Sequence, residues 1–125
     1  MFRKVDCVLL RVPDLEAALH FYRDGLGLKP AWRRDGNSAG LKMTDSDTEF
    51  VLLQESGSPE TDLLVESVES AREAFQRAGG TVVEPPFEIP IGKSAVLRDP
   101  WGNSLVILDV SKGPLRTDQD GNVVA

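Results

Sequence analysis

The sequence predicts an α+β fold in which a βαβββ pattern occurs twice. Two segments with a helical period each follow a short apolar strand. Each helix is followed by three further strand-like segments separated by turn signals. The two copies align at an offset of 53 residues, which places Val12 on Val65 and Tyr22 on Phe75. Few residues are identical between the two copies, so the repeat is one of hydrophobic pattern rather than of residue identity.

The length of the chain limits how many domains it forms. With 125 residues there is room for one domain with a hydrophobic core but not for two ordinary ones. We expect residues 1–112 to form a single domain from two modules, of about residues 4–55 and 60–110. Residues 113–125 are expected to form a C-terminal tail, as a partly ordered arm rather than a disordered end.

Composition and charge exclude several classes of protein. Hydrophobic residues are 41% and charged residues 27%, which is typical of a soluble globular chain. The net charge of -6 argues against nucleic acid as a partner, because phosphate contacts need clustered Lys and Arg. No apolar run approaches the roughly 18 residues that span a membrane. With one cysteine and no signal-peptide pattern in MFRKVDCVLL, a cytoplasmic location is expected.

The first module opens with an apolar strand at residues 4–12. Because polar residues do not alternate along it, we expect burial on both faces. Pro13 ends the strand, Asp14 caps the following helix, and Gly25 and Gly27 end that helix. The inward stripe of the helix is expected to contain Leu15, Ala18, Leu19 and Tyr22.

Three strands and a linker complete this module. The turn sequences DGNS and DSD separate the strands from one another. The polar stretch SGSPE then reads as a linker. The expected strands are residues 29–34, 39–44 and 49–55.

The second module repeats the same order. A strand at residues 61–66 precedes the helix VESAREAFQRAGG, whose inward residues are Val68, Ala71, Phe75 and Ala78. The segment EPPFEIPIGK contains three prolines. We expect it to form a rim over a ligand cavity, with a long hairpin connection as the alternative. The remaining strands are expected at residues 81–84, 93–98 and 104–109.

Two longer stretches carry a family resemblance. The opening VLLRVPDLEAALHFYRDGLGL and the closing VLRDPWGNSLVILD, within tandem βαβββ units, resemble the vicinal oxygen chelate superfamily, which includes glyoxalases, bleomycin-resistance proteins and extradiol dioxygenases. The resemblance covers about residues 5–110. It implies that each module curls its mixed sheet into half of a cup around a ligand cavity, and that the chain forms a homodimer. The enzymes of this superfamily hold a divalent metal with four side chains, one from the first and one from the last strand of each module.

The motifs locate those four positions here. The first-strand positions are Cys7 and Glu60, and the last-strand positions are Val106 and, by the same offset of 53, Leu53. Neither Leu53 nor Val106 offers a donor atom, which leaves two ligands where three or four are usual. We therefore expect no metal and no cofactor. A strand register slipped by one residue would instead bring Gln54 or Asp109 to the site and restore a metal centre.

Several other residues are candidates for ligand contact. Arg11 and Arg98 could supply polar contacts, and Trp32 is the better candidate for a pocket aromatic. Trp101 lies in a turn, which favours surface or dimer contact. Cys7 also reads as a small buried hydrophobe, and Glu60 as a solvated residue at a strand end. A single His20 in a helix supports no Ser-His-Asp triad, and no phosphate-binding glycine loop occurs.

The resemblance and the missing donors together favour one function. We expect a metal-free small-molecule-binding protein that sequesters an organic ligand of aromatic, aliphatic or cationic character, similar to the bleomycin-resistance proteins, and is not an enzyme. One alternative is a metal-dependent lyase, isomerase, epimerase or extradiol-type dioxygenase. Another is a regulatory or interaction module with a vestigial cavity, whose tail docks a partner. The expected ligand-binding residues are Cys7, Arg11, Trp32, Leu53, Glu60, Arg98 and Val106.

Overall fold

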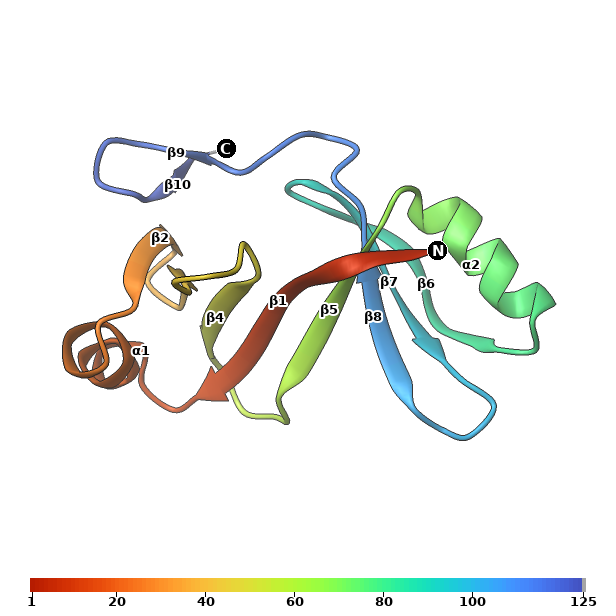
Figure 1. Cartoon of the computed structure of the whole chain (residues 1–125), viewed down its shortest axis with the longest axis horizontal. Coiled ribbons are helices and arrows are strands. Elements are labelled where there is room, and N and C mark those ends of the chain that lie inside the picture. The colour runs from red at the N-terminus through yellow and green to blue at the C-terminus, as the bar shows by residue number, and fades with distance from the viewer. Residues whose placement is uncertain (125) are drawn as a thin grey trace. The chain divides into compact units, whose positions relative to one another are not determined.

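The computed structural model describes residues 1–124, which fall into two compact units (Figure 1). Unit 1 comprises residues 1–5 and 61–115, and unit 2 comprises residues 6–60 and the chain from residue 116 onward. Each unit therefore contains the body of one βαβββ module. That the two modules close into one domain stays a prediction.

Unit 2 contains a four-stranded sheet in the order β2-β3-β4-β1. Strand β1 runs parallel to β4, and the other neighbours are antiparallel. The predicted helix forms, but it changes character midway: α1 (Leu15–Leu19) continues into the π-helical η1 (His20–Gly25). The strands are β1 (Phe2–Val12), β2 (Lys29–Arg34), β3 (Ser38–Lys42) and β4 (Glu49–Gln54).

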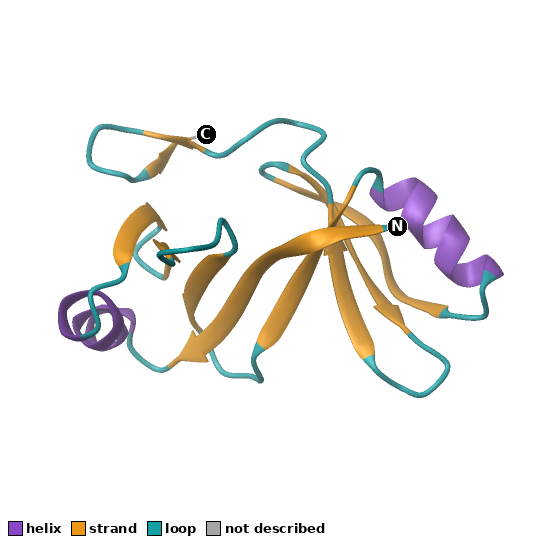
Figure 2. Ribbon diagram, viewed as in Figure 1, coloured by secondary structure: helices purple, strands orange, loops and turns teal. Residues whose placement is uncertain are grey.

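The helix of unit 2 covers one face of its sheet (Figure 2). Asp14 caps α1 as predicted, because its carboxylate accepts a hydrogen bond of 3.2 Å from the Ala17 N–H. The residues that pack between helix and sheet are at most 1% exposed. They are Leu15, Leu19, Ala39, Leu41 and Leu52. This core leaves the opposite face of the sheet without a helix.

Unit 1 repeats the arrangement, with strands in the order β5-β8-β7-β6 and β5 parallel to β8. Its helix α2 (Val68–Arg77) begins at Ser67, whose hydroxyl accepts a hydrogen bond from the Ser70 N–H. The strands are β5 (Glu60–Val65), β6 (Thr81–Ile89), β7 (Gly92–Arg98) and β8 (Ser104–Leu108). The core consists of Val65, Val68, Ala71, Ala95, Leu97 and Ile107, with Phe75 partly buried against it.

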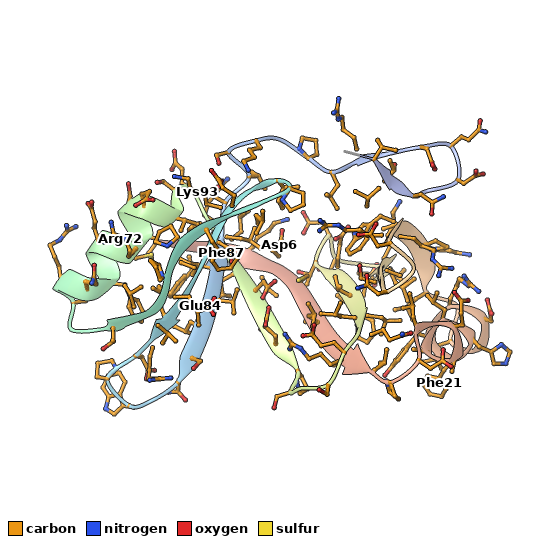
Figure 3. The ribbon with its side chains drawn as sticks, turned by 180° about the vertical axis from the view of Figure 1, so that it is seen from behind. Asp6, Phe21, Arg72, Glu84, Phe87 and Lys93 are labelled. Carbon is orange, nitrogen blue, oxygen red and sulfur yellow. The ribbon has the colours of Figure 1, made fainter. Side chains whose placement is uncertain are left out.

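Ion pairs tie α2 to the strand beneath it. Figure 3 shows Arg72 on α2 and Lys93 on β7 in the same part of unit 1. Both cations bind Glu69, Arg72 at 3.2 Å and Lys93 at 3.4 Å. These side chains are partly exposed, so the ion pairs contribute little to the stability of the fold.

Two sequence-based expectations about burial and loops are wrong. Strand β1 is not buried on both faces, since Cys7 is its one buried residue, and the reason is that a helix covers only one face of this sheet. The stretch EPPFEIPIGK is mostly strand rather than a long connection: β6 continues to Ile89 and pairs with β7. Pro85 and Pro86 lie at an irregularity of an edge strand, where a missing N–H is tolerated.

Residues 116–124 of the C-terminal tail belong to unit 2 and contain a hairpin. Its strands β9 (Arg116–Thr117) and β10 (Val123–Val124) pair as a small antiparallel hairpin. The Gly121 carbonyl accepts a hydrogen bond of 2.9 Å from the Arg33 N–H, so the hairpin lies against the edge of β2. The tail thus covers part of a sheet edge that would otherwise be open. Across residues 1–124, neither the length nor the hydropathy of any helix suits a membrane span.

Candidate functional site

The last strand of each module ends in a polar side chain that binds the start of the module's helix. In unit 2, the side-chain oxygen of Gln54 accepts a hydrogen bond of 2.8 Å from the Leu15 N–H. In unit 1, a carboxylate oxygen of Asp109 accepts one of 2.9 Å from the Val68 N–H. Leu15 and Val68 are 53 residues apart, whereas Gln54 and Asp109 are 55 apart. The offset between the modules therefore changes between the helix and the last strand.

This change corrects one of the four motif positions. Val106 lies opposite Asp62 in the pairing of β5 with β8. The counterpart of Asp62 in the first module is Leu9, and Leu9 lies opposite Val51. The mate of Val106 is therefore Val51, and its assignment to Leu53 by a constant offset is wrong. The number of metal-donor side chains at the four positions does not change, because Val51 also has no donor atom. It is only 6% exposed.

The hypothesis of a slipped strand register is also wrong. The Gln54 and Asp109 side chains bind the helix starts rather than the opposite sheet face. Asp109 is 4% exposed and accepts further hydrogen bonds from the Lys93 N–H at 3.0 Å and the Ser111 hydroxyl at 2.8 Å. Burial raises the pKa of Asp109, but these hydrogen bonds outweigh it and leave the pKa below its ordinary value. Both side chains are structural.

Arg11 joins the two ends of the loop between β4 and β5. Its guanidinium donates to the Glu55 carboxylate at 2.8 Å, the Ser58 carbonyl at 2.6 Å and the Glu60 carboxylate at 3.1 Å. The hydrogen bond to Glu55 raises the pKa of Arg11, and burial only partly opposes it. A side chain at Gly57 would put its Cβ 2.6 Å from Arg11 Cδ, so the loop lies directly on the arginine. Arg11 and Glu60 are thus brought together, and the Glu60 carboxylate is engaged by protein.

Trp32 lies across the sheet of unit 2. Its indole N–H donates to the Glu49 carboxylate at 2.9 Å, and a Cβ at Gly40 would collide with the indole ring. Glu49 in turn lies opposite Cys7 in the pairing of β1 with β4. Sequence reasoning missed Glu49, although its alternation with Val51 indicated that both lie on one face.

These residues share the sheet face that α1 does not cover. Leu10 and Val12 pack toward the helix, so the alternate residues of β1 point the other way. Arg11 lies opposite Leu53, and Leu9 opposite Val51, which gives the middle of the face an apolar floor. The face, which we call the helix-free face of unit 2, carries Cys7, Leu9, Arg11, Trp32, Glu49, Val51 and Leu53.

The two remaining predicted residues belong to unit 1. Val106 lies opposite Val96 and Arg98 opposite Ser104. Ile107 and Leu97 pack in the core under α2, so Val106 and Arg98 lie on the face of this sheet that α2 leaves uncovered. Arg98 is exposed and forms no ion pair within residues 1–124.

The donor chemistry does not fit the four-ligand metal site that the resemblance implies. The motif positions hold a thiol at Cys7, a carboxylate at Glu60 that binds Arg11, and hydrocarbon at Val51 and Val106. Within residues 1–124, no three His, Cys, Asp or Glu side chains are grouped so that they could hold a metal ion. We therefore derive no step through a metal.

Comparisons with known proteins establish the family. The model of the Glyoxalase/Bleomycin resistance protein/Dioxygenase superfamily matches residues 4–107, so the chain belongs to that superfamily. This confirms the resemblance, and with it the α+β glyoxalase-type fold. Among proteins of curated function, none matches the sequence.

Solved structures show the same fold. Hypothetical protein BH1468 from Bacillus halodurans matches with a TM-score of 0.75 at 18% identity, covering 90% of this chain and 98% of that one. Methylmalonyl-CoA epimerase from Streptomyces coelicolor, in complex with 2-nitronate-propionyl-CoA, matches with a TM-score of 0.72 at 16% identity, covering 89% and 99%. The Mn(II)-bound glyoxalase from Novosphingobium aromaticivorans matches with a TM-score of 0.64 at 25% identity. The match covers 94% of this chain but 42% of that glyoxalase.

Proposed function

We propose that this protein binds a small organic molecule on the helix-free faces of its sheets, without a resident metal, and sequesters it without chemical change. The observation that carries the proposal is the chemistry of the four motif positions. Val51 and Val106 are hydrocarbon, and the Glu60 carboxylate is bound by Arg11 at 3.1 Å. A face that cannot hold a metal but has an apolar floor suits a ligand that binds by burying its apolar surface.

The helix-free face of unit 2 also indicates the class of ligand. Its floor of Leu9, Val51 and Leu53 favours an aromatic or aliphatic body. The cluster at one end contains two carboxylates, Glu55 and Glu60, for one guanidinium, so it carries a net negative charge. A ligand with an apolar body and a cationic or hydrogen-bond-donating group fits both features.

The proposal includes a homodimer in the cytoplasm, which the family resemblance supports. Trp101 is 83% exposed and lies in a turn held by Asp99, which accepts hydrogen bonds from the Trp101 and Asn103 N–H groups. An exposed indole on a turn whose backbone is fixed by these hydrogen bonds suits contact between copies. Sedimentation of the wild type and of Trp101→Ser tests this: a dimer that dissociates in the variant supports the contact, and a monomeric wild type contradicts the dimer.

A thermal-shift screen tests the binding proposal. The screen uses matched aromatic compounds that are cationic, neutral or anionic. A ligand at about a hundred times its dissociation constant should add about 2.7 kcal/mol to the free energy of unfolding. We expect aromatic cations to give the largest shifts. If no compound raises the unfolding temperature of the wild type, the proposal is wrong, and the alternative of an interaction module is favoured.

A pair of variants tests whether the ligand binds on the helix-free face. Leu53→Gln puts an amide into the floor and should weaken ligand binding about tenfold, since burying a leucine contributes about 1.5–3 kcal/mol. Leu105→Gln is the matched control, because Leu105 is also half-buried but pairs with Leu97 of the α2 core. Equal loss in both variants would mean that the ligand does not contact this face.

A further inference from the structure

A separate pocket lies on the helix side of unit 2. It is a recess of about 620 Å³ where η1 ends and β2 begins. The rings of Tyr22 and Phe50 lie 4.9 Å apart and form part of its wall. Leu26 and Met43 add further apolar lining. None of these residues belongs to the helix-free face.

The end of the π-helix shapes this recess. The Leu26 N–H bonds the Phe21 carbonyl, and the chain then turns at Gly27, which has a φ of 83°. This wide ending leaves Leu26 59% exposed at the mouth, and Figure 3 shows Phe21 on the outside of the same helical turn. Single π-helical turns occur frequently at functional sites.

Two lysines give the recess its charge. Lys29 and Lys42 both line it, and they lie directly opposite each other in the pairing of β2 with β3. Like charges in directly opposite positions destabilise a sheet. Lys93 and Lys112 are ion-paired, with Glu69 and Glu88.

By contrast, Lys29 and Lys42 make no ion pair within residues 1–124, although the chain carries a net charge of -6. The other cross-strand neighbour of Lys42 is Glu49, whose carboxylate accepts the Trp32 indole N–H. An anion bound at the mouth of the recess would relieve the repulsion between the two ammonium groups.

We propose that this recess binds a small organic anion with an apolar body, such as a carboxylate on a medium-length alkyl chain or an aromatic ring. The headgroup lies between Lys29 and Lys42, and the body contacts Tyr22 and Phe50. The volume of the recess is within the usual range of about 300–1,000 Å³ for small-molecule sites. Lys42 lies opposite Glu49, and Lys29 lies opposite Lys42, so both lysines lie on the same sheet face as Glu49. The headgroup therefore contacts the end of the helix-free face, and the body enters the recess on the helix side.

The single tyrosine of the chain makes the recess directly observable. Full-length protein labelled with 3-fluorotyrosine has one ¹⁹F signal, from Tyr22, and is titrated with sodium octanoate kept below its micelle concentration. We expect a saturable shift of that signal. In protein labelled with 5-fluorotryptophan, the signal of Trp101, which belongs to unit 1, should stay in place. Trp32 does not serve as the control, because its hydrogen-bond partner Glu49 lies opposite Lys42. A shift of Trp32 without Tyr22 would overturn the proposal.

Charge variants and matched probes test the role of the lysines. Lys29→Gln and Lys42→Gln should each weaken octanoate binding about two- to fivefold, as for exposed ion pairs, while Lys112→Gln leaves it unchanged. Leu26→Asp should weaken binding more than the isosteric Leu26→Asn. Octanol and octylammonium should bind more weakly than octanoate. Equal binding of octanol and octanoate, or wild-type affinity in the double lysine variant, would contradict the proposal.

A further control distinguishes a second protein chain from a small anion. If a second copy occupies the recess through Leu26 and Phe21, the Tyr22 signal shifts with protein concentration and octanoate does not move it. That result would overturn the proposal. Variants that lose the dispersed ¹⁹F spectrum of the folded protein are replaced by Lys29→Met and Lys42→Met, which keep most of the apolar stem and remove the charge.

Discussion

At the scale of single residues, a few buried polar atoms decide how the strands are positioned. Asp109 is 4% exposed and its carboxylate binds backbone N–H groups of Val68 and Lys93. It therefore joins the start of α2 to the start of β7. A Cβ at Gly92 would collide with this carboxylate, so the site requires glycine beside it.

Replacing Asp109 should expose this role. Asp109→Asn keeps the shape but loses the charge, and should lower the free energy of unfolding by about 1–3 kcal/mol at neutral pH. Because the folded-state pKa of Asp109 lies below its unfolded value, the stabilisation is present above about pH 4 and is lost as the pH falls through the folded pKa. Urea unfolding of both proteins should show curves that converge in acid. A constant difference across that range would contradict this role.

A second residue-scale prediction concerns Gly40. Gly40→Ala should displace the Trp32 indole, break its hydrogen bond to Glu49 and lower the free energy of unfolding by about 1–3 kcal/mol. The measurement is tryptophan fluorescence in a Trp101→Phe background, where Trp32 is the remaining indole. We expect a red shift in Gly40→Ala and none in Gly25→Ala, whose added Cβ makes only an ordinary contact of 3.5 Å with the His20 carbonyl. An unchanged spectrum in Gly40→Ala would show that the indole does not lie on this glycine.

The candidate site was only partly predictable from such residues. The sequence identifies Arg11, Glu60 and Trp32 as polar candidates, but not that Arg11 engages Glu60 through a loop closed over Gly57. That contact depends on a backbone with a φ of 142° at Gly57, which no local pattern indicates. Glu49 was missed because a carboxylate at the start of a strand resembles an ordinary solvated residue.

At the scale of elements, period and turn chemistry predict most of the strands and both helices. The predicted residues 29–34 coincide with β2, and Asp14 caps α1 as expected. The failures come from tertiary effects. In the π-helical half of the first helix, Tyr22 packs against Phe50 of β4, and β6 continues past two prolines at a sheet edge.

At the scale of the whole molecule, the chain retains the superfamily fold while two of the four metal-binding positions hold valine. The match to the superfamily over residues 4–107 shows common architecture, and architecture alone does not fix activity. The two proposed binding sites depend on the apolar floor, the cluster of Arg11 with Glu55 and Glu60, and the paired lysines of the recess. These features support binding of organic ligands rather than metal-centred chemistry.

The metal content of the purified full-length protein tests this most directly. The protein is incubated with Mn²⁺, Ni²⁺, Zn²⁺ and Fe²⁺, dialysed against metal-free buffer and analysed for each element. We expect well under one equivalent of any metal per chain, because Val51 and Val106 cannot coordinate and Glu60 binds Arg11. Retention of about one equivalent of a divalent metal per chain would contradict the metal-free function and favour a metal-dependent enzyme.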